Sequence, residues 1–376
     1  MPAPSAYLDH AATSPLRPEA LAAMLPFLSE HFGNPSGSHA VSRRARRAIE
    51  EARDVVAMHT GRPSGEVVFT SGGTEACNLA VLGVHGSAGG EVRCSAFEHH
   101  AVLHACLACG GRLVPVGTDG LVDLDALADS LHPGVRLVSL MLVNNEVGTI
   151  QPLEEAVAVV RARAPEALVH TDAAAAGAWI DLQAPCAQAD LVSLGAHKFG
   201  GPKGVGVLLV RSGVKLAPVF HGGPQERARR PGTHDVAGIV GMAAALEAAV
   251  ARRAEECRSV GTLRRRLVDG LVEAVPGAHP TAGATARLPS SAHLRFDGVD
   301  QEELLMLLDD AGVCASAGSA CASGALDPSH VLLAMGFSAV EAREAVRFSL
   351  GWSTTAQEID LALAAVPKAV EQLRAG

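Results

Sequence analysis

The stretch VVFTSGGTEACNLA (residues 67–80) reads as a strand, a glycine-rich turn and the start of a helix. The same order, an apolar β-rich run followed by a helical segment rich in Ala, Leu and Glu, recurs along the first two-thirds of the chain. The apolar runs are 66–70, 91–95, 112–116, 135–143, 167–171, 190–194 and 205–210. This alternation is typical of crossover connections on a parallel sheet. We therefore predict an α/β fold whose mostly parallel seven-stranded sheet is flanked by helices.

The pattern changes after about residue 250. A long charged helix is predicted over roughly 240–274, with a break near Gly261. Strand-like SSAHLRF (290–296) and VRFSLGW (346–352) then enclose the helical stretch 300–312. Because 376 residues also exceed what one hydrophobic core usually spans, we predict a smaller α+β domain here.

Composition excludes several classes of protein. The 31 Lys and Arg against 40 Asp and Glu give a net charge of −9, which disfavours nucleic acid as the main partner. Apolar residues at 48% and charged residues at 19% exclude a disordered chain. The start MPAPSAYLDH has no signal-peptide pattern and no apolar run is long enough to span a membrane, so we expect a cytoplasmic protein. The 8 scattered cysteines are expected to be free thiols.

Three separated segments carry groups that suit one cofactor. Gly73 and Thr74 open a helix whose free N–H groups could bind phosphate, although a plain capped turn is the more common explanation for this motif alone. Asp172 ends a strand, where ligands gather in α/β sheets, and Lys198 follows another strand in a glycine-rich loop. A phosphate cradle, a carboxylate and a loop lysine together meet the needs of pyridoxal phosphate: an anchor, a partner for the ring nitrogen and a Schiff-base amine.

Other polar residues occupy similar positions. His99 follows a strand and could stack on a flat ring, and Asn145 could hydrogen-bond a ring substituent, but a capping His and a turn Asn are the plain alternatives. Arg347 lies in an apolar strand and needs a carboxylate, either structural or from a substrate. The loop HGGPQERARRPGTHD (221–235) holds an arginine cluster that is a candidate anion or interface site.

Cysteine is treated position by position. Cys321 lies in ASAGSACASG (315–324), where small residues offer little to bury a thiol, so we predict a reactive cysteine. Cys106 and Cys109 form a CxxC without a second ligand pair, and we predict no metal site.

Taken together, these motifs resemble the cysteine desulfurase family, pyridoxal-phosphate enzymes of the fold-type I, class V aminotransferase group. Motifs in the family's order and at nearly its spacing cover essentially the whole chain: YLDHAAT, FGNPSGSH, VVFTSGGTEACNLA, EHHAVL, NNEVGT, HTDA, AHKFGGPKGVG, HGGPQER, PGT, GSACASG, DPSHVL and VRFSLG. The long GSACASG segment is most similar to the housekeeping branch that serves iron–sulfur assembly and tRNA thiolation. The resemblance implies a fold-type I PLP-dependent transferase with a large cofactor-binding domain over 14–250. A small α+β domain over 1–13 and 251–376 would carry the cysteine segment and Arg347.

The resemblance also implies roles for the site residues. Lys198 would be the Schiff-base lysine, and Asp172 would pair with the pyridinium nitrogen. His99 would stack on the ring and assist proton transfer, and Asn145 would contact the phenolic oxygen. Cys321 would be the nucleophile that accepts sulfur.

The phosphate and the substrate carboxylate have their own implied ligands. The phosphate site would comprise Gly73, Thr74, Gly195, His197 and, from the other subunit of a homodimer, Thr233. Arg347, helped by Asn34, would hold the carboxylate. Two positions depart from the family pattern: Ala175 stands where many members have Gln, and Gly195 where they have a phosphate-binding Ser. Each missing hydrogen bond would cost about 0.5–1.5 kcal/mol unless water replaces it.

The implied reaction converts L-cysteine to L-alanine and leaves the sulfur on Cys321 as a persulfide. A sulfur-acceptor protein would take it onward for iron–sulfur cluster assembly or nucleic-acid thiolation, with no direct binding of nucleic acid or membrane. Two alternatives stay open: a selenocysteine lyase or other class V lyase, since one scaffold hosts several reactions, and a catalytically weakened sulfur-relay scaffold, suggested by Ala175 and Gly195.

Overall fold

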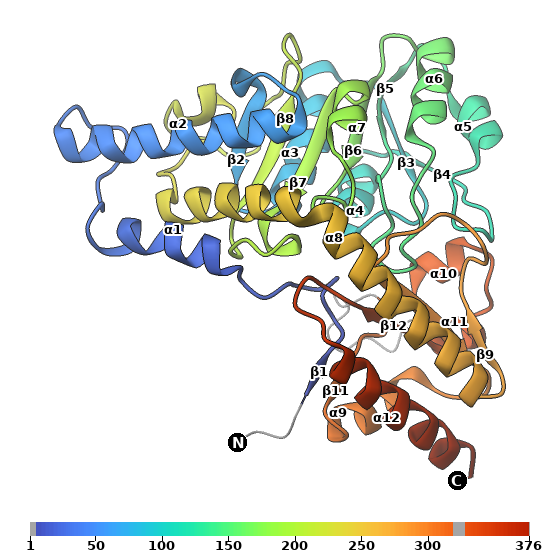
Figure 1. The fold of residues 1–376 in the computed structure, drawn as a ribbon. Helices are drawn as coiled ribbons and strands as arrows, with labels where there is room; N and C mark the ends of the chain where they lie inside the picture. The colour runs from blue at the N-terminus through green and yellow to red at the C-terminus, as the bar shows by residue number, and fades with distance from the viewer. Residues whose placement is uncertain (1–4, 319–327, 376) are drawn as a thin grey trace.

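A seven-stranded sheet forms the centre of the larger part of the molecule (Figure 1). The computed structural model describes residues 5–318 and 328–375. The strands, in their order across the sheet, are β2 (Val67–Thr70), β8 (Gly206–Val210), β7 (Leu191–Gly195), β6 (Leu168–Asp172), β5 (Val135–Ser139), β3 (Glu91–Ser95) and β4 (Arg112–Val114). Strand β8 is antiparallel to both neighbours, and the other pairings are parallel. The predicted sheet is confirmed.

Helices cover both faces of this sheet. They are α1 (Pro18–Ser29), α2 (Ala40–Thr60), α3 (Gly73–Ala88), α4 (His100–Ala108), α5 (Leu124–Ser130), α6 (Leu153–Arg163), α7 (Gln183–Gln188) and the start of α8 (Val236–Ala274). Residues of α3 and α4 share one buried cluster with Val68, whereas α2, α6, α7 and α8 share another with Val67 and Phe69. Alternate residues of β2 therefore pack on opposite faces of the sheet, as the two-residue period of a strand requires.

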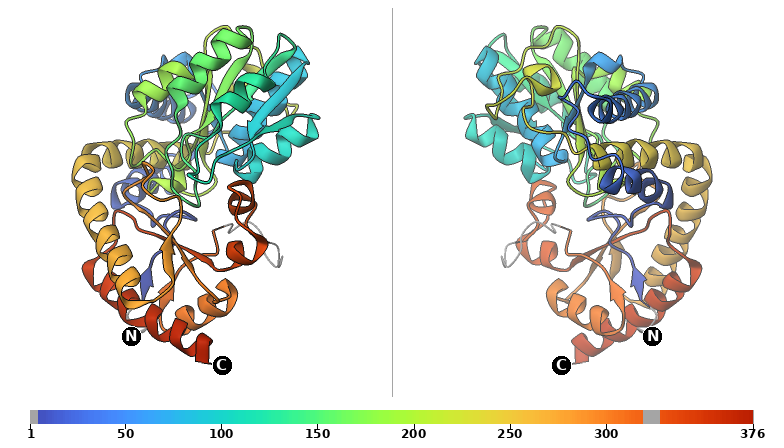
Figure 2. Two further views of the ribbon diagram at one scale, coloured as in Figure 1. Left: turned by 90° about the vertical axis from the view of Figure 1, so that its right-hand side faces the viewer. Right: turned by 90° about the vertical axis from the view of Figure 1, so that its left-hand side faces the viewer.

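The C-terminal elements form a second hydrophobic core, below the sheet in the views of Figures 1 and 2. Its elements are the sheet β12 (Ala345–Ser349), β10 (Ser291–Phe296) and β9 (Ala278–Pro280), the parallel pair β1 (Ala6–Tyr7) and β11 (Val313–Cys314), and the helices α9 (Gln301–Asp310) and α12 (Ala356–Ala375). The short helices α10 (His330–Ala334) and α11 (Ala339–Arg343) pack in a separate small cluster with Phe97 and Met141. Ala6 and Leu8 are fully buried in the second core, so the N-terminal segment packs with the C-terminal third of the chain.

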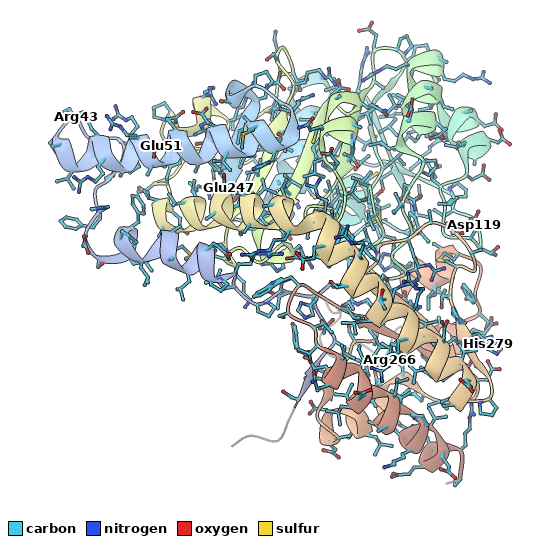
Figure 3. All side chains as sticks on the ribbon, viewed as in Figure 1. Arg43, Glu51, Asp119, Glu247, Arg266 and His279 are labelled. Carbon is cyan, nitrogen blue, oxygen red and sulfur yellow. The ribbon has the colours of Figure 1, made fainter. Side chains whose placement is uncertain are left out.

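Helix α8 joins the two cores. It is one continuous 39-residue helix, so the break expected near Gly261 is wrong. The helix begins on the sheet and ends against the second core, and it carries exposed charges such as Glu247 and Arg266 (Figure 3). Because residue 250 lies within this connecting helix, we propose it as the boundary between domains 14–250 and 1–13 with 251–376. Within the described ranges, every helix is too short or too polar to span a bilayer.

Candidate active site

A cavity of about 590 Å³ opens at the edge of the sheet where β6 and β7 end. Nine of the residues predicted for the site line it: Gly73, Thr74, His99, Asn145, Asp172, Gly195, His197, Lys198 and Arg347. They come from elements far apart in the sequence. Most follow strands of the large sheet, whose carboxyl ends coincide at one edge, whereas Arg347 comes from β12 of the smaller sheet. The volume lies within the range of small-molecule and cofactor sites.

Lys198 follows β7 directly, in a short 3₁₀ turn over Ala196–Lys198. Its Nζ donates to the backbone oxygen of Ala12 at 3.0 Å and also to that of Ala11. These two carbonyls belong to the N-terminal segment that packs with the second core. The amine is therefore held at the junction of the two cores, inside the cavity.

The loop after Lys198 is fixed by a buried ion pair. Arg17 binds both carboxylate oxygens of Glu256, at 2.9 and 2.7 Å, and its Nε donates to the Phe199 carbonyl at 3.1 Å. Gly200 has a φ of +87°, and a Cβ there would lie 2.5 Å from the Arg17 side chain. Only glycine fits this close approach without displacing the arginine that holds the lysine loop.

The N-terminus of α3 forms the other end of the cavity. A Cβ on Gly206 of β8 would lie 2.5 Å from the backbone of Gly72, so this turn rests directly on the neighbouring strand. Built Cβ atoms on Gly73 or Gly195 would meet only ordinary contacts of 3.7–3.9 Å. A hollow therefore remains between the first N–H groups of α3 and the end of β7, as an anion-binding cradle requires.

His99 and Asp172 are two further polar side chains that line the cavity. Burial lowers the pKa of His99, although the nearby Asp172 opposes the shift, so the imidazole is neutral at pH 7. Its Nδ1 accepts the N–H of Ala101 at 3.1 Å, which places the proton of the neutral ring on Nε2. Asp172 accepts the N–H of Ala174 at 2.9 Å, at the end of β6. The site thus offers a neutral imidazole donor near a carboxylate.

Arg347 is a buried cation that lines the cavity. It is 1% exposed, and its Nη2 binds Asp9 at 2.8 Å. Its Nη1 donates to the carbonyls of Asn145 at 2.9 Å and Gly318 at 3.0 Å. Among the described residues, its buried Nε has no hydrogen-bond partner. The arginine therefore has a structural carboxylate and still keeps one donor for another acceptor.

Of the described residues that were predicted for the site, Asn34 and Thr233 do not line this cavity. Asn34 is exposed in the loop between α1 and α2, which lies at the left of the view in Figure 1, and it does not line the cavity. Thr233 is also exposed and does not line the cavity. Cys321 lies outside the described residues.

Sequence reasoning missed other residues of the site. Asp9 pairs with Arg347 although the two are 338 positions apart, and Lys203 and Glu146 line the cavity. Their motifs, YLDHAAT, GGPKG and NNEVG, are visible in the sequence, but nothing in them shows which side chains face the site. The arginine cluster of 221–235 contributes Arg230, which pairs with Glu75 beside the α3 cradle at 2.8 Å.

Comparisons with known proteins identify the family of the chain. The aminotransferase class-V family matches residues 6–362, and the chain therefore belongs to it. The cysteine desulfurase IscS of Methanosarcina thermophila is 40% identical over 98% of this chain and 92% of its own length. A solved NifS-like protein superposes with a TM-score of 0.91 at 34% identity, covering 98% of this chain and all of that one. A structure of SspA in complex with cysteine matches with a TM-score of 0.80 at 31% identity over 93% of this chain and all of that one.

Within the class V family, the relatives place this chain among the cysteine desulfurases. Enzymes of this family depend on pyridoxal 5′-phosphate. The residues present fit that group: a hollow at the start of α3 suits its phosphate, Asp172 suits its ring nitrogen and the Lys198 amine suits its aldehyde.

Proposed function

We propose that this chain converts L-cysteine to L-alanine with pyridoxal 5′-phosphate and accepts the sulfur on Cys321. One observation carries the proposal: a single cavity gathers Lys198, Asp172, His99 and the N-terminus of α3. The likeness to a protein solved in complex with cysteine supports the choice of substrate.

The phosphate would be bound by the first N–H groups of α3 at Gly73 and Thr74, with His197 beside them. Lys198 would anchor the cofactor covalently, and Asp172 would keep its ring nitrogen protonated. When bound, the cofactor draws electrons from the α-carbon of the amino acid and so activates the side chain for loss of sulfur.

Arg347 would orient the substrate. A carboxylate placed at its unpartnered Nε gains a charge-assisted hydrogen bond in a buried setting. Because Asp9 and two backbone carbonyls hold the rest of the guanidinium, the arginine is already oriented before the substrate arrives. The amino acid would then extend from Arg347 toward Lys198.

Protons would be handled by Lys198 and His99. With cofactor and substrate bound, the amine of Lys198 would serve as the base that carries a proton from the α-carbon of the amino acid. The neutral His99 presents its Nε2–H, so it can donate a proton without first being protonated.

The sulfur would pass to Cys321. The thiolate attacks the sulfur of cysteine, the carbon–sulfur bond breaks and a sulfur–sulfur bond forms, while the product carbon takes up a proton. The balance is L-cysteine plus a cysteine thiol giving L-alanine plus a persulfide. An acceptor protein of iron–sulfur assembly or of tRNA or other nucleic-acid thiolation would then collect the sulfur.

We further propose a homodimer. Leu21, Leu25 and Leu28 recur along α1 and are 48–63% exposed, and Phe32 beyond them is 77% exposed. An apolar stripe of this kind usually marks an interface. Pairing two copies could bring Thr233 of the partner subunit to the phosphate, which accounts for its position outside the cavity of one chain.

The experiment is borohydride reduction of the full-length chain with bound cofactor, followed by peptide mapping and by assay of alanine from L-cysteine. We expect the cofactor mass on the peptide that contains Lys198 and one alanine per sulfur released. Attachment to another lysine, or turnover of selenocysteine but not cysteine, would contradict the proposal. Lys215, an exposed lysine on a surface loop, is the internal control and stays unlabelled.

A further inference from the structure

Lys203 lies at the phosphate end of the cavity. It precedes β8, whose first residue, Gly206, pairs with Thr70 of β2 and with Gly195 of β7. Because Gly206 rests on the backbone of Gly72, the Lys203–Gly204 turn lies next to the start of α3. Lys203 and Gly204 line the same cavity as Gly73 and Thr74.

Among the residues that the structure describes, this end of the cavity has no other available positive charge. Burial, reinforced by the cations Lys198 and Lys203, lowers the pKa of His197 to about 4, so its ring is neutral at pH 7. Arg230 is held by Glu75 at 2.8 Å, and Glu75 also accepts the N–H of Ser71 at 2.7 Å. The Arg230–Glu75 pair therefore adds no net charge to the cradle.

The other cations of the cavity are engaged elsewhere. Arg347 pairs with Asp9, and the Lys198 amine is bonded to the carbonyls of Ala11 and Ala12. Lys203 is exposed, and no ion pair of Lys203 occurs in the part of the chain that the structure describes. Its flexible four-carbon stem lets the ammonium reach an anion bound in the cradle.

The N-terminus of α3 alone does not balance the charge of a bound phosphate. A phosphate monoester carries about −1.5 to −2 charges at pH 7, whereas a helix N-terminus offers roughly half a positive charge. Gly195 supplies no hydroxyl, and a Cβ there would lie 3.7 Å from both the Gly73 nitrogen and the His197 ring. The space for a side-chain donor at Gly195 is thus present, but the donor is not.

We propose that the ammonium of Lys203 binds the cofactor phosphate and takes the place of the hydroxyl that Gly195 lacks. The inference rests on the proposed function, in which the cavity binds pyridoxal 5′-phosphate. It concerns affinity for the cofactor, and the chemistry at Lys198 is unchanged by it.

The test measures binding of two compounds to the full-length chain freed of cofactor, by equilibrium dialysis. Pyridoxal 5′-phosphate carries the phosphate and pyridoxal does not. Lys203→Gln is expected to raise the Kd for pyridoxal 5′-phosphate about tenfold and to leave the Kd for pyridoxal unchanged. Lys215→Gln removes an exposed loop lysine that follows β8, beyond the end of the strand opposite to Lys203. It is expected to change neither Kd.

A double variant tests whether Lys203 replaces the hydroxyl that Gly195 lacks. Adding Gly195→Ser to Lys203→Gln is expected to restore most of the lost affinity, because the hydroxyl fills the open space. The inference is overturned if Lys203→Gln binds pyridoxal 5′-phosphate as tightly as the wild type, or if it weakens both compounds equally. A wild-type chain that binds neither compound would overturn the proposed function itself, and this inference with it.

Discussion

Replacing Glu226 by glutamine should remove a buried carboxylate that holds the loop 221–235 against the sheet. Arg53 binds both oxygens of Glu226 at 2.9 and 2.8 Å, and the Phe69 N–H donates to it at 2.9 Å. The loop needs this support, because Glu226 and the two residues after it have left-handed φ angles of 47° to 61°. Non-glycine residues adopt such angles only at a cost.

The size of the expected loss of stability follows from the pKa of the Glu226 carboxyl group. Burial disfavours its charge, but hydrogen bonds from His234 and Arg53, and the charge of Arg53, lower the pKa of Glu226 from 4.5 to about 2. A depressed pKa adds stability above the unfolded value, and that stability is lost as the pH falls toward the folded value. The ionised Glu226 carboxylate with its partners therefore contributes about 3 kcal/mol to the free energy of unfolding at neutral pH, and about half of that near pH 3.

The assay is urea unfolding of wild type and Glu226→Gln from neutral to acid pH. The difference in free energy of unfolding should be about 3 kcal/mol at neutral pH and should narrow as the medium is acidified. Glu50→Gln is the control, because Glu50 contacts the same arginine at 3.3 Å but is 55% exposed, and it should cost under about 1 kcal/mol. Equal losses in the two variants, or a difference that does not depend on pH, would refute the reasoning.

Two further predictions concern the cavity. Arg347→Gln should raise the KM for cysteine about 10- to 100-fold, because the substrate carboxylate loses a charge-assisted hydrogen bond; an unchanged KM in steady-state kinetics would exclude Arg347 as the carboxylate ligand. Gly206→Ala places a Cβ 2.5 Å from the Gly72 backbone and should lower both the free energy of unfolding, by about 1–3 kcal/mol, and the affinity for cofactor. Gly65→Ala, which meets open space, should change neither, and equal effects of the two alanine variants would contradict the predicted clash.

Much of the fold could be predicted from local patterns. All seven apolar runs became strands of one sheet, since buried parallel strands need continuous apolar sequence. Asp172 and Lys198 could be assigned to the cavity because residues that follow strands gather at one edge of a parallel sheet. The helix break predicted near Gly261 was wrong, because packing of α8 against the second core outweighs the weak helix propensity of one glycine.

The remainder depends on contacts that local sequence does not encode. The Asp9–Arg347 pair joins the two ends of the chain and exists only once the second core has formed. The GGPKG motif does not show that Lys203 faces the cavity; the contact between Gly206 and Gly72 places it beside the cradle. Asn34 and Thr233 do not line the cavity of one chain, and the predicted role of Thr233 requires the second subunit of the proposed homodimer.

The most direct test of the account is incubation with L-cysteine carrying a sulfur isotope, followed by mass spectrometry of the cysteine peptides. We predict one labelled sulfur atom added to the peptide that contains Cys321, with alanine formed in equal amount. The peptide that contains Cys314, a half-buried thiol, should stay unlabelled. Alanine formation with no label on Cys321 would contradict the central claim that this cysteine accepts the sulfur.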